Sequence, residues 1–251
     1  MNDLLSNYAV VLVAPQGGLN VGSVARVMAN FGFSDLRLVT PVINHLGDDA
    51  RRMAVKASSI LEAASVFPDL TSALADCQLA LGTTRRFGKY RENFLHPGDI
   101  PEFTSPHIKH GSIALVFGRE DSGLLTEELD LCQRFITIPT KDELPSMNLA
   151  QAVSLCLYET AKGTFDSEVE PTQNQLASGE MLESMYQHMR KTLLSIDYLH
   201  PQNPDHILHA FRRIFGRALL NDREVRIVRG MFRQIDWVES GRKSRIESEK
   251  S

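Results

Sequence analysis

Short apolar runs alternate with helical patterns over the first two thirds of the chain, and this order restricts the fold more than any other feature. Ile113–Phe117 is apolar at every position, which is typical of a central strand covered on both sides. Strands that alternate with helices form a mainly parallel sheet with helices on both faces, so we predict an α/β fold. The expected strands are Tyr8–Ala14, Asp35–Val39, Gln78–Gly82, Ile113–Gly118 and Phe135–Pro139, and the expected helices are Gly22–Phe31, Leu70–Asp76, Thr126–Gln133 and Asn148–Thr164.

The composition changes after residue 164, where this alternation ends. Residues 165–178 are rich in Asp, Glu, Pro, Thr, Gln and Asn, have little to bury, and are predicted to be a linker. We therefore expect a domain over 1–164, which a chain with 43% hydrophobic residues can support, and a small all-helical C-terminal extension over 179–240. The extension shows helical patterns at Gly179–Leu199, Asp205–Leu219 and Asp222–Trp237, and 241–251 is a charged tail.

The net charge of −4 is unevenly distributed along the chain. Residues 1–175 carry 14 basic and 21 acidic groups, whereas residues 176–251 carry 13 basic and 10 acidic groups. Because Lys and Arg neutralise the phosphates in nucleic-acid binding, the C-terminal part is the expected side for any nucleic-acid partner. Its run 205–233 contains seven arginines against three acids. Salt bridges to a partner helix are the alternative use for these arginines.

The sequence gives no sign of a metal, a membrane or secretion. The three cysteines fit no metal-ligand spacing and are expected to be buried thiols, and the pairs His107/His110 and His206/His209 are expected to be surface or capping residues. No apolar stretch approaches the length of a membrane span, and no basic leader precedes the first strand. We expect a soluble cytoplasmic protein that needs no metal.

A glycine-rich turn, Pro15–Ser23, follows the first predicted strand and leads into a helix. Backbone N–H groups and the helix dipole in such a turn suit an anion. A dinucleotide fingerprint is disfavoured, because the spacing is not GxGxxG and the second strand ends in Val39-Thr40-Pro41 without the acid that holds a ribose. Asn20 and Arg26 stand six positions apart, so we expect both side chains to face the space above the sheet edge, where the planar guanidinium suits a phosphate group.

Two further polar loops follow predicted strands. Leu115–Leu124 passes from a buried strand into Gly-Arg-Glu-Asp-Ser-Gly, where the last residue, Gly123, permits a tight return. Ile138–Val153 passes through a polar loop into a helix that Ser146 or Asn148 can cap. Ligands bind at the carboxyl edge of parallel sheets, so these loops are the expected walls of a pocket.

In their order and spacing, Asn20–Arg26, Leu115–Leu124 and Ile138–Val153 resemble the three motifs of the SpoU/TrmH-like RNA 2′-O-methyltransferases of the SPOUT class. The segments Leu193–Leu199, Phe211–Ala218 and Glu224–Met231 are similar to the helical extension of the TrmJ branch of this family. The resemblance implies a deep trefoil knot in the α/β domain, a homodimer, and S-adenosyl-L-methionine as methyl donor with S-adenosyl-L-homocysteine as product. It also implies 2′-O-methylation of tRNA at nucleotide 32 of the anticodon loop, on cytidine, uridine or both.

The same resemblance assigns roles to individual residues. Arg26 is expected to be catalytic, either as a base assisted by the RNA phosphate or as a clamp on that phosphate that stabilises the forming alkoxide; we favour the clamp, because arginine stays protonated in proteins. Asn20 is expected to orient the sugar, while Ser146 and Asn148 order the pocket. The expected donor contacts are Thr83, Thr84, Arg85, Gly118, Glu120, Gly123, Ile138, Pro145, Ser146 and Met147. The expected RNA contacts are Arg26, Arg86, Lys89, Arg212, Arg213 and Arg217.

Two positions depart from the family pattern. Met147 replaces the usual Leu, and Pro145 lacks an N–H, so no donor contact from that nitrogen is expected. Two alternative functions stay open, namely methylation of ribosomal RNA by the same fold and RNA binding by a relative that has lost catalysis. The intact polar residues of all three motifs argue against the loss.

Overall fold

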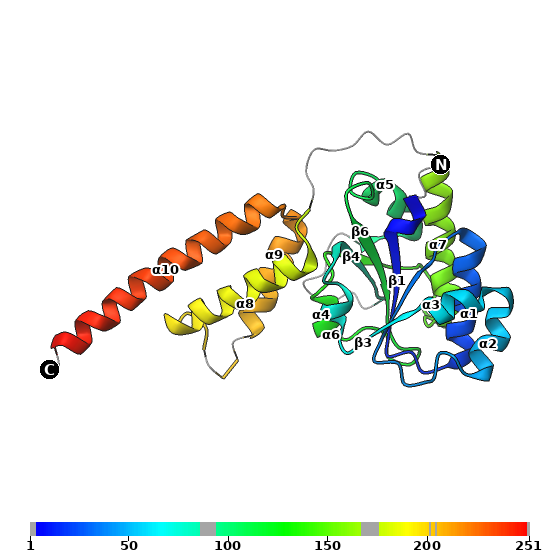
Figure 1. The fold of residues 1–251 in the computed structure, drawn as a ribbon, viewed down its shortest axis with the longest axis horizontal. Helices are drawn as coiled ribbons and strands as arrows, with labels where there is room; N and C mark the ends of the chain where they lie inside the picture. The colour runs from blue at the N-terminus through cyan, green and yellow to red at the C-terminus, as the bar shows by residue number, and fades with distance from the viewer. Residues whose placement is uncertain (1–3, 86–93, 167–175, 201, 204, 250–251) are drawn as a thin grey trace.

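The computed structural model describes residues 4–85, 94–166, 176–200, 202–203 and 205–249. Within this part of the chain a seven-stranded sheet has the order β3-β2-β1-β6-β4-β7-β5 (Figure 1). All of its neighbouring strands run parallel, which confirms the predicted α/β class and the parallel sheet. The strands are β1 (Tyr8–Val13), β2 (Asp35–Val39), β3 (Ser65–Phe67), β4 (Cys77–Thr83), β5 (Phe94–Leu95), β6 (Ser112–Phe117) and β7 (Arg134–Ile136).

Side chains alternate between two cores along the strands. On β1, Val10 and Leu12 face one core, while Val11 and Val13 face the other. The first core is closed by α1 (Gly18–Phe31), α2 (Asp48–Ala54), α3 (Ser58–Ala63), α5 (Ile100–Thr104) and α7 (Leu149–Asp166), and the second by α4 (Leu70–Ala73) and α6 (Thr126–Leu129). Helices therefore cover both faces, as predicted, and the central strands are apolar throughout because both of their faces are buried.

Several elements differ from those expected from the sequence. α1 begins at Gly18, four residues earlier than predicted, so Asn20 lies in its first turn. The short strands β3 and β5, the helices α2, α3 and α5, and the 3-10 turns η1 (Leu4–Asn7), η2 (Val55–Ala57) and η3 (Pro97–Asp99) were not predicted. Elements of two to seven residues contain too few apolar positions to show a period.

The C-terminal extension consists of α8 (Gly179–Ser195), α9 (Asp205–Ala218) and α10 (Asp222–Glu249). They share a core of their own that includes Met185, Leu208 and Phe232. α10 continues through most of the predicted charged tail, because no proline interrupts it. Residues 176–178, predicted to belong to the linker, are part of this unit: the Ala177 N–H donates to the Leu220 carbonyl over 2.9 Å.

Polar contacts dock the extension on the sheet domain beside α4 and α6 (Figure 1). The Glu180 N–H donates to the Ala75 carbonyl over 3.0 Å, and His209 Nδ1 lies 2.6 Å from Asp130 Oδ2. Arg134, at the start of β7, donates to the carbonyls of Gly216 and Arg217 over 3.2 Å each. A cation at the last carbonyls of a helix satisfies groups that lack helical partners, so Arg134 caps α9 from the neighbouring domain.

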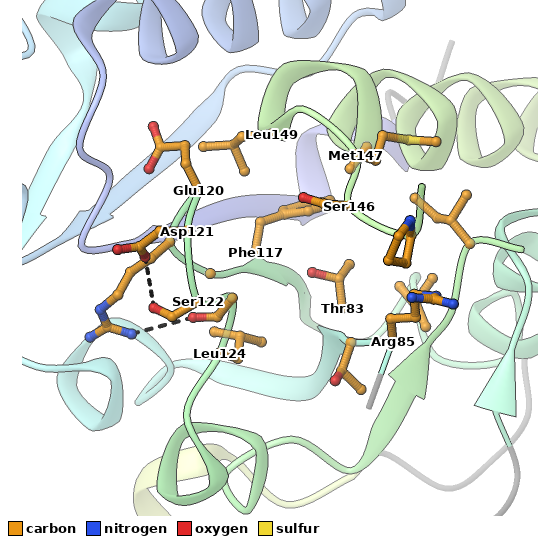
Figure 2. Close-up of a pocket in the computed structure, with 18 of the residues that line it drawn as sticks. Thr83, Arg85, Phe117, Glu120, Asp121, Ser122, Leu124, Ser146, Met147 and Leu149 are labelled. Atoms are coloured by element: carbon orange, nitrogen blue, oxygen red, sulfur yellow. Dashed lines mark hydrogen bonds between the residues drawn. The ribbon is translucent and has the colours of Figure 1, made fainter. Parts of the chain in front are cut away.

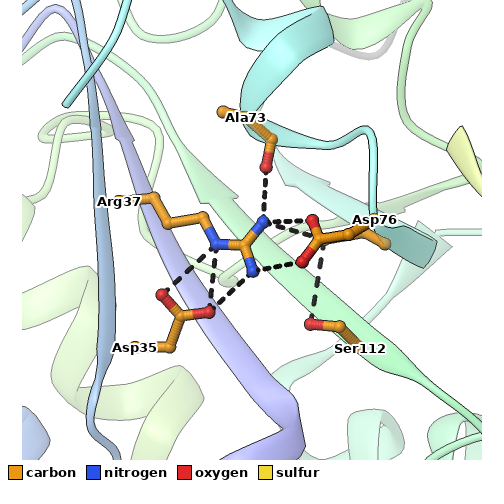
Figure 3. A network of polar contacts seen from close by, with 6 residues as sticks. Asp35, Arg37, Ala73, Asp76 and Ser112 are labelled. Carbon is orange, nitrogen blue, oxygen red and sulfur yellow. Dashed lines mark hydrogen bonds and ion pairs between the residues drawn. The ribbon is translucent and has the colours of Figure 1, made fainter. Parts of the chain in front are cut away.

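An ion-pair network joins strands at the edge of the sheet where β2, β4 and β6 begin (Figure 3). The Arg37 guanidinium contacts Asp35 over 2.8 Å, pairs with Asp76, and donates to the Ala73 carbonyl over 2.7 Å. The Arg37 side chain is 9% exposed. It thus ties β2 to the turn between α4 and β4.

Candidate functional site

A cavity of about 340 Å³ opens at the edge of the sheet where the central strands end. Thr83 of β4, Phe117 of β6 and Ile136 of β7 form its floor, and the loops after these strands form its walls (Figure 2). It lies within the size range of small-molecule pockets. Its lining includes every predicted donor contact: Thr83, Thr84, Arg85, Gly118, Glu120, Gly123, Ile138, Pro145, Ser146 and Met147.

The loop after β6 folds back on itself. The backbones of Arg119 and Gly123 exchange two hydrogen bonds, of 3.2 and 2.9 Å. Gly123 has a φ of 67°, in the left-handed region that favours glycine. A Cβ on Gly118 would lie 2.1 Å from the Gly123 carbonyl carbon, so only glycine fits there. Both glycines are thus explained by the loop itself, whose tip carries Glu120.

Glu120 holds the glycine-rich turn of the first motif against this loop. Its carboxylate accepts from the N–H groups of Gln16 and Gly17, over 2.9 and 3.0 Å, and from Asn20 Nδ2 over 3.0 Å. Partial burial opposes ionisation, but these hydrogen bonds outweigh it and lower the pKa of Glu120 below its ordinary value. The turn that resembles a phosphate site therefore already holds a carboxylate from its own chain.

Asn20 connects all three motifs. While its Nδ2 donates to Glu120, its Oδ1 accepts from Asn148 Nδ2 over 2.9 Å. Asn148 Oδ1 in turn accepts from the Ala150 N–H over 3.0 Å at the start of α7. Of the two residues predicted to cap this helix, Asn148 does so. Both polar atoms of the Asn20 amide are thus hydrogen-bonded within the chain, so Asn20 connects the first motif to the other two.

The glycine of the first motif also has a packing role. A Cβ on Gly22 would lie 2.1 Å from the Ala50 carbonyl oxygen, because α1 and α2 pack closely there. No side chain fits at that position. The small residue in the motif therefore follows from helix packing and needs no ligand to explain it.

Two loops meet across the mouth of the cavity. Arg85, after β4, lies 2.8 Å from Asp142 in the loop that precedes α7. Thr83 Oγ1 donates to the Val116 carbonyl over 3.0 Å, and Thr140 Oγ1 donates to the Pro145 carbonyl over 3.3 Å. The hydroxyl of Ser146 faces the cavity without such an anchor in the part of the chain described.

Arg26 lies away from this cavity. It is exposed on α1, does not line the cavity, and makes no hydrogen bond or ion pair with the described residues. Asn20 does not line the cavity either, so the expectation that Asn20 and Arg26 share one space stays a prediction. Arg86 and Lys89, predicted to contact RNA, lie outside the described residues.

The three arginines predicted to bind RNA on α9 have different surroundings. Arg212 pairs with Glu183 at 2.8 Å, its guanidinium carbon lies 4.4 Å from the Tyr186 ring centre, and its side chain is 13% exposed. Its charge is already paired inside the extension. Arg213 is half-buried and Arg217 is exposed.

Several lining residues were not predicted from the sequence. Asp121, Ser122 and Leu124 follow Glu120 in the same loop, and Leu149 and Ala152 lie in the first turn of α7. Position could have identified Asp121, Ser122 and Leu124, because they follow the end of β6, and ligands bind at the carboxyl ends of parallel strands. The motif pattern alone predicted Gly118, Glu120 and Gly123 in this part of the chain.

The described residues hold no cluster of three His, Cys, Asp or Glu side chains that could bind a metal ion. The predicted buried thiols are confirmed, and burial raises the pKa of Cys77 and of Cys156 to about 12. In the same part of the chain, none of the helices combines the length and the apolar character needed to span a membrane.

Comparison with known proteins assigns the chain to a class. Residues 7–158 match the sequence model of the SpoU rRNA Methylase family, and residues 180–248 match that of the C-terminal domain of tRNA methyltransferase TrmJ. The first match covers more than half of the chain, so the chain belongs to the SpoU methylase family.

Similar relatives within this family are TrmJ proteins. The tRNA (cytidine/uridine/adenosine-2′-O-)-methyltransferase TrmJ of Pseudomonas aeruginosa (strain UCBPP-PA14) is 35% identical over 250 residues, which cover 95% of this chain and 97% of the relative. The tRNA (cytidine/uridine-2′-O-)-methyltransferase TrmJ of Sodalis glossinidius is 35% identical over 238 residues, covering 93% and 92%.

Solved structures show the same likeness. The crystal structure of TrmJ from Z. mobilis ZM4 matches with a TM-score of 0.81 at 34% identity, covering 91% of this chain and 98% of that one. The SpoU methyltransferase AviRb from Streptomyces viridochromogenes, solved in complex with the cofactor AdoMet, matches with a TM-score of 0.51 at 19% identity, covering 63% and 61%. The second match concerns the fold alone.

Proposed function

We propose that the protein transfers a methyl group from S-adenosyl-L-methionine to a ribose 2′-hydroxyl of tRNA, at nucleotide 32 of the anticodon loop on cytidine or uridine. One observation carries the proposal: a single cavity is walled by the second and third motifs and joined to the first through Asn20. The names of the TrmJ relatives and the match of the extension support tRNA over ribosomal RNA.

The residues around the cavity fit this donor. Phe117, Leu124 and Ile136 form an apolar surface that suits an adenine ring, while Ser122 and Glu120 supply polar atoms for the ribose and the amino-acid part. A carboxylate has about four acceptor positions, and the protein uses three of them on Glu120, so it retains capacity for a ligand hydroxyl or ammonium group. When bound, the donor supplies an already activated sulfonium methyl group.

The ribose hydroxyl is a poor nucleophile, so the protein must stabilise the charge that develops on its oxygen. We assign this task to Arg26, which has a free guanidinium as far as the described residues show and can hold the adjacent phosphate bidentately. Its fixed positive charge suits the clamp better than a base. Asn148, as the cap of α7, keeps the pocket wall in place.

Arg26 reaches a cavity only if a second copy of the chain supplies it, and we propose a homodimer for this reason. α1 and α7 present an exposed apolar face beside the cavity, with Leu19 44%, Leu155 41% and Tyr158 47% exposed. Arg26 stands on the same exposed side of α1. A pair of these faces would bury the apolar side chains and bring the arginine of one protomer toward its partner's cavity.

Mixing two inactive variants tests this arrangement. Arg26→Ala keeps the cavity, whereas Ile138→Trp fills it, so each homodimer is expected to be inactive. A mixed dimer has one intact cavity facing one intact arginine, and methyl transfer is expected to return. No recovery after verified subunit exchange, or an active monomer, would contradict the proposed dimer.

The function itself is tested by mapping ribose methylation by mass spectrometry on tRNA and ribosomal RNA treated with the protein. We expect a new methyl group at nucleotide 32 of tRNA. Methylation of ribosomal RNA alone would refute the tRNA assignment. RNA binding with no detectable calorimetric binding of S-adenosyl-L-methionine would identify a relative that has lost catalysis.

A further inference from the structure

We propose that Glu128, on α6 and outside the cavity lining, is a positioning residue that sets the affinity for the methyl donor by fixing the loop after β6. This inference rests on the proposed function of the cavity. Glu128 touches neither the cavity nor the first motif directly. It acts through Arg119, whose neighbour Glu120 holds the glycine-rich turn.

Glu128 and Arg119 form a two-armed ion pair at the base of the loop. Arg119 Nη1 lies 3.0 Å from Glu128 Oε2, and Arg119 Nη2 lies 2.9 Å from Glu128 Oε1. The Glu128 side chain is 15% exposed and the Arg119 side chain is 21% exposed. Parallel N–H···O bonds of this kind fix the orientation of a guanidinium as well as its distance.

The loop has few other external anchors on this side. Its ends are held together by the Arg119–Gly123 backbone pair and by the close approach at Gly118, so it moves as one unit. Arg119 Nη1 donates to the Gly123 carbonyl over 3.5 Å within the loop, and the same guanidinium pairs with Glu128. Glu128 also accepts from the Leu125 N–H over 2.7 Å where α6 begins. One carboxylate therefore binds both Arg119, where the loop begins, and Leu125, which follows the loop.

Placement of the loop matters at its tip. Glu120 accepts three hydrogen bonds from the first motif at 2.9 to 3.0 Å, distances that leave little room for a shift. Rotation of the loop would separate Glu120 from Asn20 and, through Asn20, loosen Asn148 at the start of α7. Loss of the Arg119–Glu128 pair is thus expected to change the walls of the cavity, although Glu128 itself does not line it.

A purely structural role for Glu128 would be to cap α6, and one substitution separates the two roles. Glu128→Gln keeps the size and the acceptor that caps the Leu125 N–H, since Gln serves at this position as well as Glu. It removes the charge and one acceptor for Arg119. Glu127→Gln is the matched control, because Glu127 is exposed one position earlier in the same turn.

The experiment titrates wild type and both variants with S-adenosyl-L-methionine by calorimetry and measures methyl transfer to tRNA at saturating donor. For Glu128→Gln we expect a donor Kd about tenfold higher, because the variant loses one charge-assisted contact to Arg119. We expect kcat within about twofold of wild type, because Glu128 contacts no reacting group. Glu127→Gln should match wild type in both.

Hydrogen exchange gives a readout that does not depend on the donor. The amides of Gln16 and Gly17, which donate to Glu120, are expected to exchange faster in Glu128→Gln and unchanged in Glu127→Gln. If wild type binds no donor, the proposed function fails, while faster exchange still supports the positioning role. Unchanged exchange and unchanged Kd would overturn the inference, and Arg119→Lys, which keeps the charge but not the two-armed geometry, repeats the test if Glu128→Gln does not fold.

Discussion

Glu120 and Asn20 meet although they stand one hundred positions apart in the chain. The sequence predicts that both residues matter, since each belongs to a motif, but spacing along the chain carries no information about a contact of this range. Asn148 is different, because a capping role follows from its place before an apolar helical pattern. Local chemistry was therefore predictable at this site, whereas the linkage between motifs required the fold.

The pH dependence of donor binding is expected to follow Glu120. Its pKa is lowered in the folded protein relative to the ordinary value of 4.5, so its contribution is complete above that value and is lost as the pH falls through the lowered pKa. Calorimetry should show a constant donor Kd from neutral pH to below 4.5, and weaker binding once the pH falls through the lowered pKa of Glu120.

Glu120→Gln tests the source of this dependence. An amide cannot accept from the N–H groups of Gln16 and Gly17 and from Asn20 at once, so binding at neutral pH should weaken by about tenfold or more. The acid dependence should disappear. Glu143→Gln, an exposed change in the opposite wall, serves as the control; an acid dependence that survives in Glu120→Gln would assign it to another group.

Arg26→Ala is expected to retain donor binding and lose methyl transfer by about a hundredfold or more, because a group that stabilises developing charge acts in the transition state. Arg52→Ala removes an exposed arginine of α2 that pairs with Asp49 and should leave both quantities unchanged. Single-turnover rates at saturating donor provide the measurement. Substantial activity in Arg26→Ala would remove this residue from the mechanism.

At the scale of elements, burial decided what the sequence could predict. The runs at β1 and β6 are apolar because helices cover both sides of them, and both strands were placed to within a residue at each end. β3 and β5 escaped prediction because three and two residues cannot show a pattern. α10 was expected to end at Trp237 but continues, since charged residues alone do not stop a helix.

The Arg37 network is expected to stabilise the sheet edge. Arg37→Met should lower the free energy of unfolding by about 2 kcal/mol, between the values for exposed and buried pairs, because Arg37 is buried while Asp76 is largely exposed. Hydrogen bonds from Arg37 outweigh partial burial and lower the pKa of Asp76 from its ordinary 3.8. The loss of unfolding free energy relative to wild type should therefore be complete above pH 3.8 and should shrink below it.

Denaturant unfolding at neutral and acid pH measures this effect. Arg51→Met is the matched control, because its partner Glu62 and its own side chain are both about half exposed, and its cost should be about 1 kcal/mol or less. Equal losses for the two variants would show that the buried network adds nothing beyond a surface pair.

At the scale of the whole molecule, a separate helical core is attached to the sheet domain through polar contacts and through Leu176 and Leu219, which pack against the first core. The sequence predicts the two parts from their change in composition, but not how they meet, because the contacts of Arg134 and His209 use backbone carbonyls and one buried carboxylate.

Arg134→Met should loosen this junction. Loss of its two hydrogen bonds to the end of α9 is expected to cost about 1 to 3 kcal/mol, which raises local opening of the extension by about tenfold or more. Limited proteolysis between α8 and α9 measures the opening, and the KM for tRNA is expected to rise while donor Kd stays constant. Arg217→Met leaves the carbonyl that Arg134 contacts in place, so it should not increase cleavage.

The two-sided use of the Asn20 amide limits how this protein can change over evolutionary time or in the hands of an engineer. A substitution at Asn20 removes a partner from both Glu120 and Asn148, and a substitution at Glu120 or Asn148 leaves one polar atom of Asn20 unmatched. Loops transplanted one at a time from a distant relative are therefore expected to fail where the three exchanged together succeed. The motifs, separate along the chain, are therefore expected to change together.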